Sequence, residues 1–146
     1  MGKNTGFSLI ELMVVIAIFA ILSTIAVPSM LSWRTNYKLD SAAREILSAL
    51  EYGRSRAVRD DQVVQVNFDF ANNSYSVVNQ GGATLRAGQM TADLDLQNIS
   101  LGSQVQFIGR GVPDVSGAIT IGYVADPSLV RRVNLSIGGN ARMFTP

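Results

Sequence analysis

The stretch that decides the fold is GFSLIELMVVIAIFAILSTIAVPSML, which occupies residues 6–31. Its central part contains no polar side chain, and the sequence stays mostly apolar as far as Leu31. The 25 residues from Phe7 to Leu31 would form a helix about 37 Å long at about 1.5 Å per residue, which is enough to cross a bilayer. Lys3 precedes this stretch and the next basic residue is Arg34, so the charge distribution predicts a cytoplasmic N-terminus.

Glu11 is the one charged residue inside the apolar stretch. A carboxylate at that depth in hydrocarbon costs roughly 2 to 3 kcal/mol on insertion scales. A plain membrane anchor does not need this residue, so we predict that Glu11 has a cationic partner and that the segment assembles with other chains. The alternative interpretation is that Glu11, being close to the end of the segment, lies at the level of the lipid headgroups.

The composition limits the chemistry that the chain can perform. Its 146 residues leave room for one domain beyond the apolar segment. The sequence has no cysteine and no histidine, which excludes disulfides, thiolate catalysis and a Cys/His zinc site. The net charge of +1 provides no global field that would attract nucleic acid or anionic lipid.

The remaining polar residues form no recognisable catalytic or metal-binding motif. A serine nucleophile would need a lysine or carboxylate base, and Lys38, the only lysine after Lys3, lies on a segment predicted to be an exposed helix. Two acidic pairs, Asp60-Asp61 and Asp93-Leu94-Asp95, offer too few ligands for a Ca²⁺ ion. We therefore predict no enzymatic activity, no catalytic residue, no metal site and no cofactor.

Downstream of the apolar stretch, hydrophobic residues recur at helical spacing. Apolar residues at every third or fourth position from Leu39 to Val58 predict an amphipathic helix that continues the apolar one to about Arg59. Pro28 separates the two halves; it either bends or opens a continuous helix or marks a boundary after which a fresh helix begins. Gly53 lies inside the pattern and, because it has no side chain, predicts close packing against a strand.

The period then changes from helical to two, which predicts strands. Val64, Val66, Phe68 and Phe70 alternate with polar residues as in a half-buried strand, and a turn at 71–74 follows. The further predicted strands are 75–78, 84–90, 105–108, 118–124, 131–137 and 141–144, with Gly138-Gly139-Asn140 as the last hairpin turn. The predicted fold class is α+β: a long N-terminal helix, transmembrane and then amphipathic, packed on an antiparallel β-sheet C-terminal domain.

The motif Gly6-Phe7-Ser8-Leu9-Ile10-Glu11-Leu12, which follows a short basic leader, resembles the processing site of type IV pilins and type II secretion pseudopilins. The resemblance implies that a prepilin peptidase and N-methyltransferase cuts after Gly6 and methylates the new amino group of Phe7. It also implies that Glu11 pairs with the N-terminal ammonium of a neighbouring subunit in a filament, and that the helix bends or locally melts at Pro28. Cutting by an ordinary signal peptidase near Ala26-Val27-Pro28 is the alternative, and it would remove the whole segment.

The rest of the chain resembles the GspH/FimT group of pseudopilins and minor pilins, through looser motifs. These are Ser55-Arg56-Ala57-Val58-Arg59, Phe107-Ile108-Gly109-Arg110-Gly111-Val112-Pro113 and Leu135-Ser136-Ile137-Gly138-Gly139-Asn140-Ala141-Arg142. The predicted domains are a prepilin leader at 1–6, a transmembrane and polymerisation helix at 7–31, its amphipathic continuation at 32–60 and a β-rich periplasmic domain at 61–146 (the pilin fold). Two features depart from the group: no cysteine pair staples the C-terminus, and only Arg142 remains of the final basic residues.

The resemblance implies a minor pseudopilin or pilin, which is the initiation or tip subunit of a type II secretion pseudopilus or a type IV pilus. Such a subunit is a single-pass protein of the bacterial inner membrane with a cytoplasmic N-terminus and a periplasmic C-terminal domain, and it belongs to a periplasmic or extracellular filament after assembly. Its implied partners are the prepilin peptidase, other pilin or pseudopilin subunits, the inner-membrane assembly platform and, before assembly, membrane lipid.

The alternative function is DNA binding at a filament tip for DNA uptake, since some FimT-like proteins present C-terminal arginines to DNA. The contributors here would be Arg86, Arg110, Arg132 and Arg142, which would neutralise phosphates. Arg131 and Arg132 are adjacent, so on a strand they face opposite sides and at most one of them joins a given patch. No aromatic residues interleave with these arginines as in a single-strand stacking platform, and solvated arginines on a sheet are the simpler interpretation.

Overall fold

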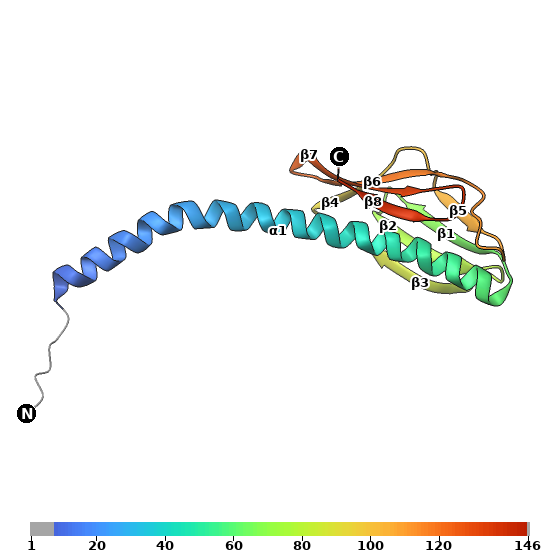
Figure 1. The fold of residues 1–146 in the computed structure, drawn as a ribbon, viewed down its shortest axis with the longest axis horizontal. Helices are drawn as coiled ribbons and strands as arrows, with labels where there is room; N and C mark the ends of the chain where they lie inside the picture. Colours follow the sequence, from blue (N-terminus) through green and yellow to red (C-terminus); the bar gives the residue numbers. More distant parts are fainter. Residues whose placement is uncertain (1–7, 146) are drawn as a thin grey trace, which may run out of the picture. The chain divides into compact units, whose positions relative to one another are not determined.

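The computed structural model describes residues 8–145, without the side chains of residues 26–29, 31 and 98. In this part of the chain one helix is followed by eight strands (Figure 1). Helix α1 spans Leu9–Asp60, and the strands are β1 Val64–Asp69, β2 Ser74–Asn79, β3 Thr84–Gln89, β4 Leu94–Asn98, β5 Gln104–Phe107, β6 Gly117–Tyr123, β7 Asp126–Leu135 and β8 Ala141–Phe144. The chain divides into two compact units, Met1–Thr35 and Asn36–Pro146.

The first unit is helical from Leu9 onward. Helix α1 continues through position 28, so Pro28 lies inside a helix rather than at a boundary between two helices. Part of the predicted membrane segment, 7–31, falls outside the described residues. In the part of the chain that the structure describes, no helix is both long enough and apolar enough to cross a membrane. The transmembrane segment stays a prediction.

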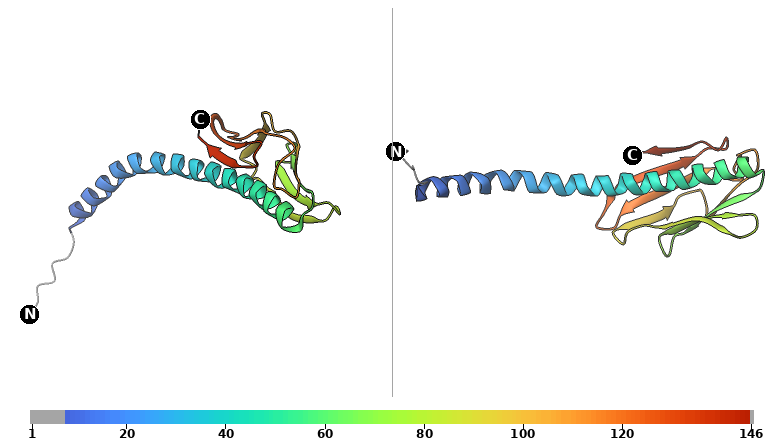
Figure 2. Two further views of the ribbon diagram at one scale, coloured as in Figure 1. Left: turned by 45° about the vertical axis from the view of Figure 1, so that its right-hand side comes forward. Right: turned by 90° about the horizontal axis from the view of Figure 1, so that it is seen from below.

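The strands of the second unit form two antiparallel sheets, with four strands each in the described residues. The first sheet has the strand order β3-β2-β1-β5 and the second β4-β6-β7-β8. In the first sheet, Val66 of β1 lies opposite Val77 of β2 on one side and Val105 of β5 on the other. Figure 2 shows both sheets alongside the second-unit part of α1. The predicted antiparallel arrangement is confirmed, but the strands divide into two sheets rather than joining in one.

One stripe of α1 supplies the core that the two sheets share. Leu39, Ala43, Ile46 and Leu50 are at most 1% exposed, and their spacing keeps them on one face of the helix. The same buried cluster contains residues of both sheets: Val66, Val77, Phe107, Ile119, Ile121 and Val133. Burying one such aliphatic side chain contributes about 1.5–3 kcal/mol. The predicted helix face is confirmed except at Val58, which is 52% exposed.

Gly53 lies where α1 meets the first sheet. A Cβ atom placed on this residue would lie 2.8 Å from Cγ2 of Val66 and 3.5 Å from the Phe107 ring. Real Cβ atoms essentially never make a contact as short as the first of these, and Val66 is itself fully buried. The prediction that Gly53 permits close packing against a strand is therefore confirmed.

Two ion pairs connect α1 with the second sheet and its flanking loop. Arg131 of β7 is 8% exposed; its Nε donates to Asp40 Oδ1 at 2.6 Å, and its Nη2 donates to Asn36 Oδ1 at 3.1 Å. Lys38 Nζ donates to Asp93 Oδ2 at 2.5 Å in a more exposed setting. The hydrogen bond from Lys38 is the largest of the effects that hold the pKa of Asp93 below its usual value. The first pair is the more costly to break, because the guanidinium left behind is buried.

Two strands differ from the sequence prediction. β4 is absent from the predicted strands: its two buried residues, Leu94 and Leu96, form too short an alternation to identify a strand, and the neighbouring Asp95 favours a solvated loop. β7 begins at Asp126, before the predicted start at 131. The sequence did not indicate this earlier start, because Pro127 and the polar residue after it carry no strand signal.

We expect Gly53→Ala to lower the free energy of unfolding by about 1–3 kcal/mol, although alanine is the better helix former by about 1 kcal/mol. The reason is that the added methyl group collides with the buried Val66 side chain. Thermal and urea unfolding of the chain in a non-ionic detergent, followed by circular dichroism, measures the change. Ser55→Ala, at an exposed position of the same helix, is the control and should change stability by less than about 0.5 kcal/mol. Unchanged stability of Gly53→Ala would contradict the close packing.

We expect Asp40→Ala to destabilise the fold by about 2–3 kcal/mol, because it strands the Arg131 guanidinium. This is less than a fully buried pair would cost, since the Asp40 side chain is 40% exposed. Asp93→Ala removes a carboxylate of the same kind from the exposed Lys38 and should cost no more than about 1 kcal/mol. The same unfolding measurements compare the two variants, and equal losses would show that the burial of Arg131 is energetically unimportant.

Candidate functional site

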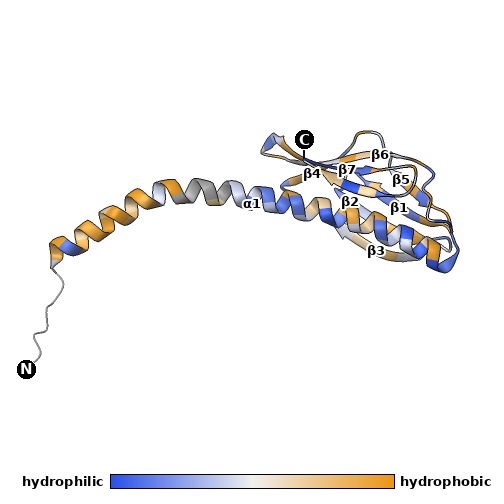
Figure 3. Cartoon of the chain, viewed as in Figure 1, coloured by the Kyte–Doolittle hydropathy of each residue, from blue (hydrophilic) through white to orange (hydrophobic). Residues whose placement is uncertain are grey.

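The first-unit part of α1 exposes apolar side chains over residues 9–25. Residues 9–25 are all exposed, and the exposed fractions of their large apolar side chains run from 38% at Val15 to 76% at Leu9. Figure 3 shows this segment as almost uniformly hydrophobic, whereas the second-unit part of α1 alternates between polar and apolar residues. A helix surface that is apolar all round is normally covered by lipid or by another protein. We therefore call residues 9–25 the candidate assembly surface.

The two hydroxyl side chains of the assembly surface are satisfied within the helix. Ser23 Oγ donates to the carbonyl of Phe19 at 2.7 Å, and Thr24 Oγ1 donates to the carbonyl of Ile21 at 2.7 Å. Hydroxyls that bond back to the preceding turn need no outside partner. The segment is therefore apolar in effect as well as in composition, apart from one residue.

That residue is Glu11, which lies in the first turn of α1 with its side chain exposed. The N-terminal end of a helix carries a partial positive charge, which favours a nearby carboxylate by about 0.3–1 kcal/mol. This is less than the roughly 2 to 3 kcal/mol that a carboxylate costs in hydrocarbon. When the assembly surface is covered, the helix alone does not compensate the Glu11 carboxylate, which favours a cationic partner from outside the helix.

The structure describes little of the other three residues predicted to take part in processing and assembly. Gly6 and Phe7, the predicted processing residues, lie outside the described residues, and so does the side chain of Pro28. The helix does include position 28. The roles of these three residues stay predictions.

The four arginines considered as DNA contacts lie in three separate places. Arg86 of β3 is half-buried against the helix, where its Nη1 donates to Ser48 Oγ at 2.9 Å. Arg110 is exposed in the loop between β5 and β6. Arg132 of β7 and Arg142 of β8 are exposed and line one hollow. The structure thus brings only two of the four together, and DNA binding stays a prediction.

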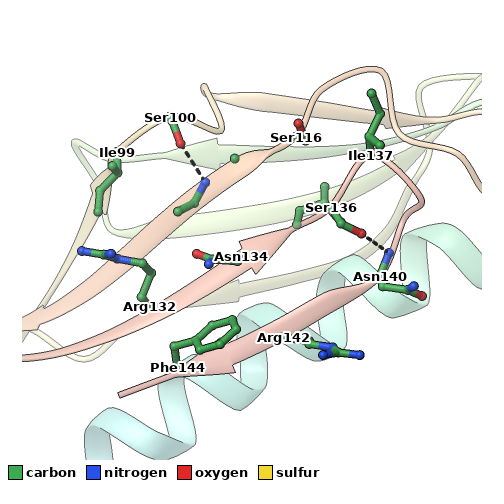
Figure 4. A pocket seen from close by; sticks show the side chains of 13 residues that line it. Ile99, Ser100, Ser116, Arg132, Asn134, Ser136, Ile137, Asn140, Arg142 and Phe144 are labelled. Atoms are coloured by element: carbon green, nitrogen blue, oxygen red, sulfur yellow. Dashed lines mark hydrogen bonds between the residues drawn. The ribbon is translucent and has the colours of Figure 1, made fainter. Parts of the chain in front are cut away.

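The hollow that these two arginines share lies on the face of the second sheet opposite to α1. Its volume is about 890 Å³. We define the β7–β8 hollow by six of its lining residues: Ile99, Arg132, Asn134, Ile137, Arg142 and Phe144. Across the two strands Arg132 lies opposite Phe144 and Asn134 opposite Arg142, which places all four side chains on one face (Figure 4). The neighbouring Arg131 points the other way and bonds to α1, so the expected opposite orientation of the two adjacent arginines is confirmed.

Two polar atoms on this face are buried without a hydrogen-bond partner among the described residues. They are Asn134 Oδ1 and Thr120 Oγ1. Thr120 is 5% exposed and lies opposite Arg132 in the register of β6 and β7. Buried polar groups are normally hydrogen-bonded, and an unpaired one costs about 1–3 kcal/mol. Both atoms are therefore unpaired within the packed part of this face, where a second molecule does not reach them.

The turn that joins β7 to β8 is anchored to α1 at one end of this hollow. Gly139 has a φ of 80°, and its amide donates to the carbonyl of Ser136 at 2.9 Å, so the predicted hairpin turn at 138–140 is confirmed. Nη1 of Arg54 donates to the carbonyl of Gly139 at 3.1 Å and to Asn140 Oδ1 at 3.0 Å. The helix thereby fixes the hairpin that carries Arg142 and Phe144.

Two of the four acidic residues weighed as metal ligands form ion pairs. Asp60 forms ion pairs with Arg56 and Arg59, and Asp93 pairs with Lys38. Among the described residues, no group of three or more His, Cys, Asp or Glu side chains could hold a metal ion.

Sequence reasoning missed the apolar and amide components of the β7–β8 hollow. Ile99 follows a strand that was not predicted, Ile137 lies in the turn region, and Phe144 is the last residue of an edge strand. Each is a single apolar residue in a short or irregular segment, so no periodic signal identifies it.

Comparison with known families gives two matches. The family model described as "Prokaryotic N-terminal methylation motif" matches residues 1–27, and the one described as "Type II transport protein GspH" matches residues 42–139. No curated protein sequence matches the chain.

Several solved structures share the fold. The type IV minor pilin FimU of Pseudomonas aeruginosa is 22% identical, with a TM-score of 0.63 over 78% of this chain and 92% of FimU. The minor pseudopilin EpsH from the type II secretion system of Vibrio cholerae is 12% identical, with a TM-score of 0.65 over 77% of this chain and 99% of EpsH. GspH of E. coli is 14% identical, with a TM-score of 0.60 over 76% of this chain and 90% of GspH.

Proposed function

Because the chain belongs to the family of type II transport protein GspH, we propose that it is a filament subunit which is processed at its N-terminus and then assembled. It is a minor pilin or pseudopilin, of a type II secretion pseudopilus or a type IV pilus. Within the filament we assign it an initiation or tip position. Its role is structural rather than catalytic.

Processing is supported by the match of residues 1–27 to the N-terminal methylation motif. We propose that a prepilin peptidase cuts after Gly6 and that the amino group of Phe7 is then methylated. Before assembly, the apolar segment holds the chain in the inner membrane with its N-terminus on the cytoplasmic side and its C-terminal domain in the periplasm. After processing, its partners are the inner-membrane assembly platform and the other pilin or pseudopilin subunits.

The observation that carries the proposal is the assembly surface with Glu11 in its first helical turn. Residues 9–25 expose large apolar side chains that the chain itself does not cover. Packing this surface against neighbouring helices buries it but leaves the Glu11 carboxylate in need of a cation. The ammonium of Phe7 on an adjacent subunit supplies that charge once the leader has been removed. Glu11 would thereby fix the register between subunits.

We expect Gly6→Val to leave the leader uncut, because a branched side chain replaces the small residue at the cleavage position. The measurement is the mass of the membrane-extracted chain from cells that carry its own filament system, and the expected result is the unprocessed mass. Thr5→Val places the same side chain one residue earlier and should be processed like the wild type. Removal of residues 1–6 from the Gly6→Val variant would contradict the assigned cleavage site.

We expect Glu11→Val to be inserted and processed normally but to fail to enter filaments. Without the carboxylate, the ammonium of the neighbouring subunit is stranded at a cost of about 3–5 kcal/mol, so incorporation should fall by a factor of about 100 or more. Quantitative immunoblotting of sheared filaments against the membrane pool measures the ratio. Glu51→Val, at an exposed position in the second-unit part of α1, is the matched control and should assemble. Full incorporation of Glu11→Val would contradict the role given to this residue.

A further inference from the structure

We propose that the β7–β8 hollow binds an extended, acidic polypeptide segment of another protein. The first reason is its charge. Arg132 and Arg142 are both exposed, and no aspartate or glutamate stands among the described residues that line the hollow. The hollow is therefore locally cationic on a chain whose net charge is only +1, and it selects a partner with carboxylates.

The spacing of the two arginines fits a strand-like partner. Arg132 lies opposite Phe144 and Arg142 lies two residues before Phe144, so the two arginines are diagonal neighbours on adjacent strands. Diagonal neighbours of this kind are about 7–8 Å apart. Alternate side chains of an extended chain lie on one face about 6.6–6.8 Å apart. These are spacings near the backbone, and the two guanidinium groups point away from each other (Figure 4), so carboxylates at alternate positions of an extended segment would meet both once the arginine side chains turn toward them.

The remaining lining residues favour a polypeptide over a nucleic acid. Ile99, Ile137 and Phe144 are 52%, 76% and 48% exposed. Phe144 lies between the two arginines in the hollow (Figure 4), so the expectation that no aromatic residue stands among the arginines is wrong at this one position, which the pairing of β7 with β8 brings together. An apolar side chain two or four residues from a carboxylate lies on the same face of an extended segment and would cover these apolar residues, whereas a phosphate backbone would not.

The number of arginines in the hollow also favours a polypeptide over a nucleic acid. Two arginines neutralise at most two phosphates, which yields weak binding that salt readily abolishes. Arg86 and Arg110 lie elsewhere on the molecule and cannot extend the patch. A peptide ligand adds apolar burial and backbone hydrogen bonds to the two charge contacts, so it retains affinity where a nucleic acid does not.

The test is fluorescence anisotropy of the full chain in a non-ionic detergent, which requires neither processing nor filament assembly. The probe is a fluorescein-labelled heptapeptide, Ser-Glu-Ser-Glu-Ser-Val-Ser, whose two glutamates and one valine share one face of an extended chain. It is titrated at about 50 mM and about 300 mM salt. We expect saturable binding to the wild type. Arg132→Gln and Arg142→Gln should each weaken it by about fivefold, and Phe144→Ser should weaken it as well.

Matched controls separate this site from a general effect. Arg110→Gln removes the same charge from an exposed loop and should change the affinity by less than about twofold. Val124→Ser removes an exposed apolar side chain outside the hollow and should also have no effect. The double variant Arg132→Glu/Arg142→Glu, checked for folding by its thermal transition, should lose the glutamate peptide and bind the corresponding lysine peptide instead.

Several outcomes would overturn the proposal. One is the lack of saturable binding up to about 1 mM peptide, which corresponds to a binding free energy weaker than about −4 kcal/mol. Others are equal binding of a glutamine–valine peptide and equal weakening by Arg110→Gln. Tighter binding of an oligothymidylate that displaces the peptide and is lost in Arg132→Gln and Arg142→Gln would reassign the hollow to nucleic acid. None of these results bears on cleavage after Gly6 or on the assembly role of Glu11, so the two proposals fail separately.

Discussion

The apolar stripe on α1 that includes Leu39, Ile46 and Leu50 is the surface on which both sheets are built. A four-stranded sheet with one apolar face needs another layer to cover that face. Here a single helix covers two sheets, so its apolar stripe must be wide and the strands must pack close to the helix backbone. Gly53 meets this demand at the first sheet, where a methyl group would collide with Val66. The positions of β1 and β7, and of every side chain they present to the outside, follow from how they pack on this stripe.

The same helix changes its character between the two units, and this change has a functional consequence. In the second unit the apolar residues form a stripe, which the chain buries by itself. In residues 9–25 they face all directions and are exposed, so no arrangement of one helix could bury them. A surface of this kind needs lipid or other subunits. Glu11 adds a charge requirement that lipid tails cannot satisfy, and this favours neighbouring subunits as the final environment.

Local patterns in the sequence predicted the helix, most of the strands and the role of Gly53, because period and residue size are properties of short segments. The pairing of β5 with β1 and of β4 with β6 depends on contacts between distant segments, so the division into two sheets could not be predicted. The burial of Arg131 was missed for the same reason: its partner Asp40 is 91 residues away in the sequence. The hollow beside Arg132 was missed because its apolar residues come from separate loops and an edge strand.

Strand β7 links the core to the β7–β8 hollow through the alternation of its side chains. Arg131, Val133 and Leu135 are buried, whereas Arg132 and Asn134 face the hollow. A slip of β7 by one residue would exchange the two sets and would place Arg132 against an apolar helix face. Because Arg132 could replace Arg131 beside Asp40 after such a slip, the ion pair does not select the register by itself. The burial of Val133 and Leu135, which a slip would expose, fixes the outward position of Arg132.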